Sequence, residues 1–62
     1  MNVSAEIIKL FNEFPSSRRA LMYQQLISNL YDNAQNSFVY ADDIEIFART
    51  IYRDHKLAEA GK

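Results

Sequence analysis

The chain has 62 residues and no cysteine, and its seven Lys and Arg against eight Asp and Glu give a formal net charge of −1. Without cysteine, the chain can form no disulfide and has no cysteine chemistry. The lone His55 and the scattered carboxylates do not have the spacing of metal ligands. The near-neutral charge differs from the basic excess of most nucleic-acid-binding proteins. A single domain of this size, residues 1–62, is close to the lower limit for a hydrophobic core, so we expect association into a homodimer, without metal or cofactor, to supply additional stability.

The first predicted helix covers residues 4–14. Ser4 is a suitable N-cap, and Glu6 lies in the first turn, where the helix dipole favours an anion. Pro15 ends the helix because it disfavours helical geometry at the preceding residue and has no amide hydrogen. One apolar face follows the spacing i, i+3, i+4, i+7 and is widened by Ile8; it contains Ile7, Leu10, Phe11 and Phe14.

The second predicted helix covers residues 16–35, with Ser16 or Ser17 as its N-cap. Its apolar residues occupy an arc of about 140°, which Met22 extends, and they are Ala20, Tyr23, Leu26, Ile27, Leu30, Tyr31 and Ala34. Residues 20–41 contain a single charge, Asp32, and the outer face of the helix holds Gln24, Gln25, Ser28, Asn29 and Asn33. A helix on a small monomer normally has a charged outer face, so we expect a second copy to cover this one.

Three residues near the start of this helix do not fit a simple amphipathic pattern. Leu21 lies nearly opposite the core face, either as an isolated exposed leucine or as part of a second contact surface. Arg18 and Arg19 lie in the first turn, where a cation is unfavourable. Either Glu13 or carboxylates of another chain offset the two arginines, or they bind an acidic partner.

The third predicted helix covers residues 41–58, after a connection over residues 33–37. Phe38, Val39 and Tyr40 are interpreted as a loop packed on the core, with Tyr40 also a candidate interface residue. Asp42 and Glu45 have the spacing of a capping box, and Gly61 follows the expected end.

Two apolar stripes follow the third helix. The main stripe contains Ile44, Phe47, Ala48, Ile51, Tyr52, His55 and Ala58. A narrower one contains Ile46, Thr50 and Leu57, which are either simply exposed or in contact with another molecule. Arg49, Arg53 and Lys56 align between the stripes at i, i+4 and i+7.

These patterns argue against catalysis. His55 falls on the apolar face, where a packed histidine is the simpler interpretation, and one glycine near the C-terminus cannot form a phosphate-binding loop. Nucleic-acid binding through Arg49, Arg53 and Lys56 is the alternative function. The same helix begins with acidic residues that would face phosphates, and a helix-turn-helix normally has a shorter link.

We expect a cytoplasmic protein. The chain has no apolar run of about 18 residues, which a bilayer-spanning helix requires. Its first residues lack the basic and apolar regions of a secretory signal, and a cysteine-free composition suits a reducing compartment. Because the chain opens with Met1 and shows no tag, we interpret it as a complete small gene product.

In its whole-chain character the sequence resembles the small accessory proteins of lambdoid bacteriophages, encoded between the recombination and excision genes of the early region. The resemblance rests on the helix from Ile7 to Phe14, the break at Pro15, Ser16 and Ser17, and the Tyr-, Leu- and Gln-rich helix that follows. It implies a host-directed regulator that binds a bacterial protein during the switch between lysogeny and lytic growth. It assigns no site residues.

The sequence therefore predicts an all-α fold in which helices 16–35 and 41–58 form an antiparallel hairpin, with helix 4–14 packed across it. The predicted function is non-catalytic regulation through a protein partner, without nucleic acid or membrane. Tyrosine, methionine and arginine are enriched at protein interfaces. The candidate partner or dimer contacts are Arg18, Arg19, Leu21, Tyr40, Ile46, Arg49 and Leu57.

Overall fold

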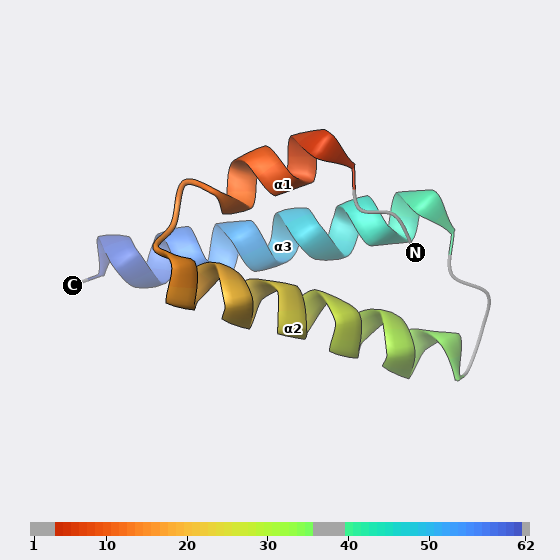
Figure 1. Cartoon of the computed structure of the whole chain (residues 1–62). Coiled ribbons are helices and arrows are strands. Elements are labelled where there is room, and N and C mark those ends of the chain that lie inside the picture. Colours follow the sequence, from red (N-terminus) through yellow and green to blue (C-terminus); the bar gives the residue numbers. More distant parts are fainter. Residues whose placement is uncertain (1–3, 36–39, 62) are drawn as a thin grey trace.

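The computed structural model describes residues 4–35 and 40–61, which form three helices. They are α1 (Ala5–Phe11), α2 (Ser16–Ala34) and α3 (Ala41–Ala60). Helices α2 and α3 form an antiparallel hairpin, and α1 lies beside α3 and runs in the same direction (Figure 1). The predicted all-α fold, with a short N-terminal helix on a helical hairpin, is confirmed for the described residues.

Helix α1 begins where the sequence predicts and ends earlier. The hydroxyl of Ser4 accepts a hydrogen bond from the backbone N–H of Ile7 at 3.3 Å, which makes Ser4 the N-cap. The predicted end at residue 14 is wrong, because the chain leaves the α-helix after Phe11. Tighter turns follow, in which Glu13 N–H donates to the Leu10 carbonyl and Phe14 N–H to the Phe11 carbonyl. These turns bring the Phe14 ring into the core ahead of Pro15.

We expect Ser4→Ala to lower the free energy of unfolding by about 1 kcal/mol, because it removes the cap of a seven-residue helix. In a domain this small, that loss corresponds to a fall in Tm of roughly 4–8 °C. Thermal denaturation followed by circular dichroism measures it. Ser28→Ala, at an exposed position inside α2, is the matched control. An unchanged Tm for Ser4→Ala would contradict the capping role.

Helix α2 does not use a serine cap. Pro15 occupies the N-cap position with φ −58° and ψ 156°, and its carbonyl accepts from Arg19 N–H at 3.0 Å. The predicted cap at Ser16 or Ser17 is therefore wrong, since both residues lie inside the first turn. The Ser16 hydroxyl instead accepts a hydrogen bond from the Arg19 guanidinium at 2.7 Å.

Helix α3 is capped by a different carboxylate from the one predicted. Asp43 accepts a hydrogen bond from the backbone N–H of Tyr40 at 3.1 Å, whereas Glu45 pairs with Arg49 on the helix surface. The helix extends to Ala60, two residues beyond the predicted end, and Gly61 is the C-cap. Tyr40 is exposed rather than packed on the core, and Phe38 and Val39 lie outside the described residues.

The core joins all three helices. Phe11 of α1 lies against Tyr23 of α2 with ring centroids 5.3 Å apart, and Phe14 contacts Tyr52 of α3 edge-on at 5.7 Å. The apolar faces predicted for α1 and α3 are largely confirmed, although Ala58 is exposed. The buried apolar residues are Ile7, Phe11, Phe14, Met22, Leu26, Leu30, Ala48 and Ile51.

The apolar face of α2 is narrower than predicted and is centred on Met22, Leu26 and Leu30. Four residues assigned to the core by their spacing are exposed: Ala20, Ile27, Tyr31 and Ala34. The physical reason is the size and position of α1. Helix α1 is only seven residues long, and it contacts α3 more extensively than it contacts α2. Among the described residues, no helix therefore covers the side of α2 that carries Ile27 and Tyr31.

Candidate functional site

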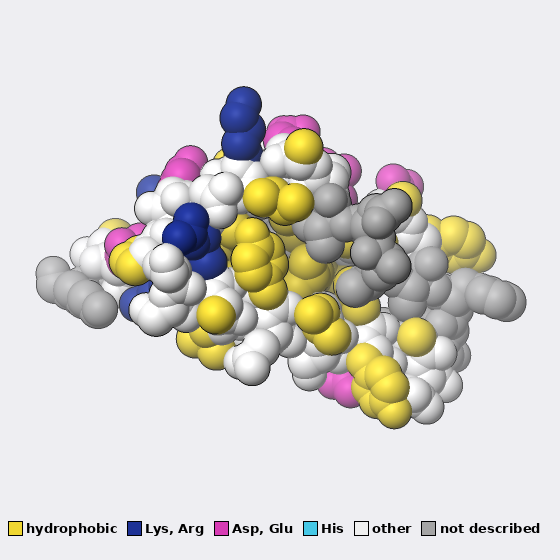
Figure 2. Space-filling model, in the orientation of Figure 1, with side chains coloured by type: hydrophobic (Ala, Val, Ile, Leu, Met, Phe, Trp, Pro, Cys, Tyr) yellow, Lys and Arg dark blue, Asp and Glu magenta, His cyan; other side chains and the backbone are white. Residues whose placement is uncertain are grey.

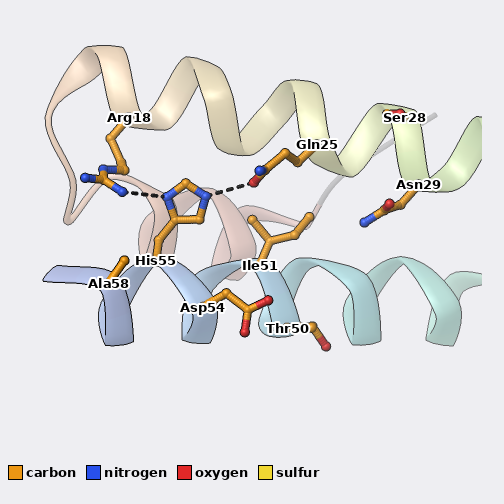
Figure 3. Close-up of a pocket in the computed structure, with 9 residues that line it drawn as sticks. All are labelled: Arg18, Gln25, Ser28, Asn29, Thr50, Ile51, Asp54, His55 and Ala58. Carbon is orange, nitrogen blue, oxygen red and sulfur yellow. Dashed lines mark hydrogen bonds between the residues drawn. The ribbon is translucent and has the colours of Figure 1, made fainter. Parts of the chain in front are cut away.

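His55 forms a hydrogen-bonded cluster between α2 and α3 (Figure 3). His55 is 7% exposed. Its ring nitrogens contact Gln25 Oε1 at 2.8 Å through Nε2 and Arg18 Nη1 at 3.3 Å through Nδ1. A guanidinium can only donate hydrogen bonds, so Nδ1 must accept from Arg18 and Nε2 must donate to Gln25. This arrangement selects one neutral tautomer of the imidazole.

The same surroundings disfavour the charged form of His55. Burial lowers the pKa of the imidazole below its ordinary value near 6.5, and the positive charge of Arg18 lowers it further. A proton on Nδ1 would also point at a donor and break the Arg18 hydrogen bond. His55 is thus held as a neutral, packed side chain, as its position on the apolar stripe of the third predicted helix indicates.

A groove of about 450 Å³ lies beside His55, between α2 and α3. Asp54 and Arg18 give it one group of each charge, and Figure 3 shows amide side chains of α2 and hydroxyl side chains of both helices along it. Within the described part of the chain, no three carboxylate or imidazole groups are arranged to hold a metal ion. The groove therefore offers scattered hydrogen-bonding groups. Its lining residues are Arg18, Gln25, Ser28, Asn29, Thr50, Ile51, Asp54, His55 and Ala58.

The predicted basic stripe of α3 takes part in contacts within the chain. Arg49 bridges Glu6 of α1 and Glu45 of its own helix, both at 3.0 Å. Lys56 pairs with Glu13 at 3.2 Å, and the same carboxylate accepts from the Tyr52 hydroxyl at 2.7 Å. The contact with Glu6 joins α1 to α3, and the contacts with Glu13 join the turn after α1 to α3. Arg53 lies 3.6 Å from Asp54.

The two arginines at the start of α2 have different partners from those expected. Glu13 does not offset them, since its carboxylate is engaged by Lys56 and Tyr52. Arg18 reaches across to His55, whereas Arg19 donates to Asn12 Oδ1 at 3.1 Å and to Ser16. Both side chains thus connect the start of α2 to neighbouring segments.

The exposed side of α2 carries a regular pattern, which we call the α2 seam. Its members follow one another at intervals of four and three residues, and Figure 2 shows hydrophobic side chains along α2 on the face in view. Ile27 and Tyr31, its largest members, are 56% and 66% exposed. None of its members is charged. The α2 seam consists of Ala20, Gln24, Ile27, Tyr31 and Ala34.

The apolar interface candidates from the sequence do not gather at one place. Leu21 is exposed but lies about 120° around α2 from Ile27. Ile46 and Leu57 are also exposed, about 16 Å apart along α3. Sequence reasoning assigned Ile27 and Tyr31 to the core and so missed the seam. The repeat of Ala20, Ile27 and Ala34 at seven-residue intervals is the signal that indicates it.

Comparison of the chain with known protein families, curated proteins and solved structures found no match. Among residues 4–35 and 40–61, no helix combines the length and the apolar character needed to cross a lipid bilayer.

Proposed function

We propose that this protein is a non-catalytic interaction module that binds another protein chain through the α2 seam. The observation that carries this proposal is the exposure of Ile27 and Tyr31 on a helix face without charge. Large apolar side chains at adjacent turns, rather than scattered singly, mark surfaces that another molecule covers. Tyrosine at such a position adds a large contact area with few rotatable bonds.

The surroundings of His55 support the non-catalytic part of the proposal. Both ring nitrogens are already hydrogen-bonded within the chain, and burial together with Arg18 lowers the pKa of the imidazole. A general base must instead reach a proton on its substrate. His55 then serves to position the start of α2 against the end of α3.

We also propose that the partner is a regulatory protein of a bacterial host, as the resemblance to lambdoid phage accessory proteins implies. The alternative, nucleic-acid binding through Arg49, Arg53 and Lys56, is less well supported. Arg49 pairs with Glu6 and Glu45, and Lys56 pairs with Glu13, so phosphate binding would have to compete with three ion pairs.

A binding assay with matched variants tests the proposal. Three proteins are immobilised and exposed to bacterial lysate: the unsubstituted chain, the Ile27→Glu variant and the Leu57→Glu variant. A protein retained by the unsubstituted chain is then purified, and its affinity for each of the three is measured by titration. We expect at least a tenfold loss of affinity for Ile27→Glu, because a charge would be buried at the contact. We expect little change for Leu57→Glu, because Leu57 is also exposed but lies on α3, away from the seam.

Equal binding by all three proteins would contradict a role for the seam. Retention of DNA or RNA instead of protein, with affinity falling steeply with salt, would replace the proposal with the nucleic-acid alternative.

A further inference from the structure

We propose that His55 is a pH-dependent switch between α2 and α3, in which a proton on Nδ1 releases Arg18 and opens the groove at the start of α2 while the three helices stay packed. The proposal is independent of the α2 seam, because neither residue belongs to it. It gives a regulatory role to a buried polar side chain that the proposed function uses only for positioning.

The imidazole holds α2 at two points, one for each ring nitrogen (Figure 3). Arg18 lies in the first turn of α2, and its Nη1 is 3.3 Å from His55 Nδ1. Gln25 lies about two turns further along the helix, and its Oε1 is 2.8 Å from Nε2. The two contacts can therefore respond separately to a change on the ring.

Protonation changes only one of the two contacts. A neutral imidazole has one nitrogen with a free lone pair, which here is Nδ1, because Nε2 carries the hydrogen donated to Gln25. A proton added to Nδ1 leaves the Gln25 contact in place. The new N–H points at the guanidinium of Arg18, which has no acceptor, and the two positive charges repel. Arg18 is already partly exposed, so its side chain can turn into solvent.

The charged groups around the imidazole favour the protonated form once Arg18 has turned away. From α2, Arg18 opposes the charge on the ring. From α3, Asp54 and Glu59 favour that charge, each less strongly than Arg18 opposes it. The turn after α1 presents the Phe14 ring, 6.2 Å from the imidazole between centroids, and Lys56 lies over this ring at 5.6 Å. Release of Arg18 thus removes the charge that most opposes protonation.

The remaining packing does not depend on a proton at the imidazole. Phe11 and Tyr23 join α1 to α2 with ring centroids 5.3 Å apart. The ion pair of Lys56 with Glu13, at 3.2 Å, joins the turn after α1 to α3. Hydrogen bonds from Tyr52 and then Lys56 lower the pKa of Glu13 below its ordinary value of 4.5, so this pair stays charged while the imidazole titrates. The switch therefore acts at the start of α2 and leaves the core intact.

Nuclear Overhauser effects in the full chain test the switch at about pH 7.5 and about pH 5, on either side of the ordinary imidazole pKa near 6.5. We expect cross-peaks between the Arg18 side chain and the His55 ring at the higher pH. These cross-peaks should be lost at the lower pH, with the same midpoint as the titration of the ring. Cross-peaks between the Phe11 and Tyr23 rings should persist at both.

Two variants separate charge repulsion from a general loosening of the chain. In His55→Gln the side-chain amide oxygen can accept from Arg18 at either pH, so the cross-peaks between these two positions should not change. Arg18→Met keeps an extended apolar side chain and removes the charge, so cross-peaks from this position to His55 should persist at the lower pH.

Arg18 cross-peaks that persist after the ring has titrated, or that are missing at the higher pH, would overturn the proposal. A ring that stays unprotonated until the chain unfolds would do the same. Simultaneous loss of the Phe11 and Tyr23 cross-peaks would show acid unfolding of the whole domain in place of a local switch. Loss of the contact in Arg18→Met at the lower pH would rule out charge repulsion as its cause.

Discussion

Replacing Phe11 with alanine is expected to remove much of the free energy of unfolding of the protein. The ring is fully buried and lies against Tyr23, and it is one of the largest completely enclosed side chains among the described residues. A buried Phe→Ala change costs about 3–5 kcal/mol through lost apolar burial and the cavity left behind. A domain of this length has a total stability of roughly 3–9 kcal/mol, so the change removes much of it.

Urea denaturation followed by circular dichroism measures this loss. Ile8→Ala is the matched control, because it removes an apolar side chain from the same short helix at a position that is 41% exposed. We expect its midpoint to change little. If Phe11→Ala and Ile8→Ala lowered the midpoint equally, the packing of α1 onto the hairpin would be wrong.

The stability of the protein is expected to fall as the pH is lowered from about 7 to about 5, and His55 is the cause. Burial and then Arg18 lower the pKa of the folded-state imidazole below 6.5. As the pH falls below about 6.5, His55 of the unfolded chain binds a proton before His55 of the folded chain does, and this difference favours unfolding. The stabilisation is therefore fully present above about pH 6.5 and is lost toward the folded-state pKa, by at most about 1.4 kcal/mol per pH unit.

Urea midpoints measured at several pH values test this prediction, because His55 is the chain's one histidine. His55→Gln removes the titrating group, so its midpoint should vary less across this range. Arg18→Gln should raise the pKa of His55, which the imidazole NMR signals report. Glu13, whose pKa is lowered by the hydrogen bond from Tyr52 and then that from Lys56, contributes stability that is lost at more acid pH, below about 4.5. An identical pH dependence in His55→Gln would contradict the prediction.

Local patterns in the sequence determined most of the helical elements. The spacing of Ile7, Phe11 and Phe14 identified the buried face of α1, and Ser4 identified its start. Such features depend on a few neighbouring residues and on the helical repeat, so they can be read without knowing the rest of the fold. The cap at Asp43 was missed because nearby carboxylates also suit the start of a helix. The end of α1 at Phe11 was missed because Pro15 allows the helix to end at any of the residues just before it.

The partners of the charged side chains could not be obtained in this way. The contacts of Arg18 with His55, Arg49 with Glu6 and Lys56 with Glu13 join residues that are far apart along the chain. The first contact depends on the alignment of α2 with α3, and the other two depend on how α1 and the turn after it lie on the hairpin. A stripe of cations on α3 looks the same in sequence whether its members face solvent, phosphate or another helix.

The sequence by itself determined the helical class, the hairpin and the presence of more apolar surface on α2 than one small domain normally buries. Only the tertiary structure decided which part of that surface remains exposed. An apolar arc of about 140° states how much a helix can bury, whereas the amount that it does bury depends on its neighbours. The face with Met22 and Leu26 is buried in the core, whereas Ile27 and Tyr31 remain at the surface because α1 is short and lies mainly on α3.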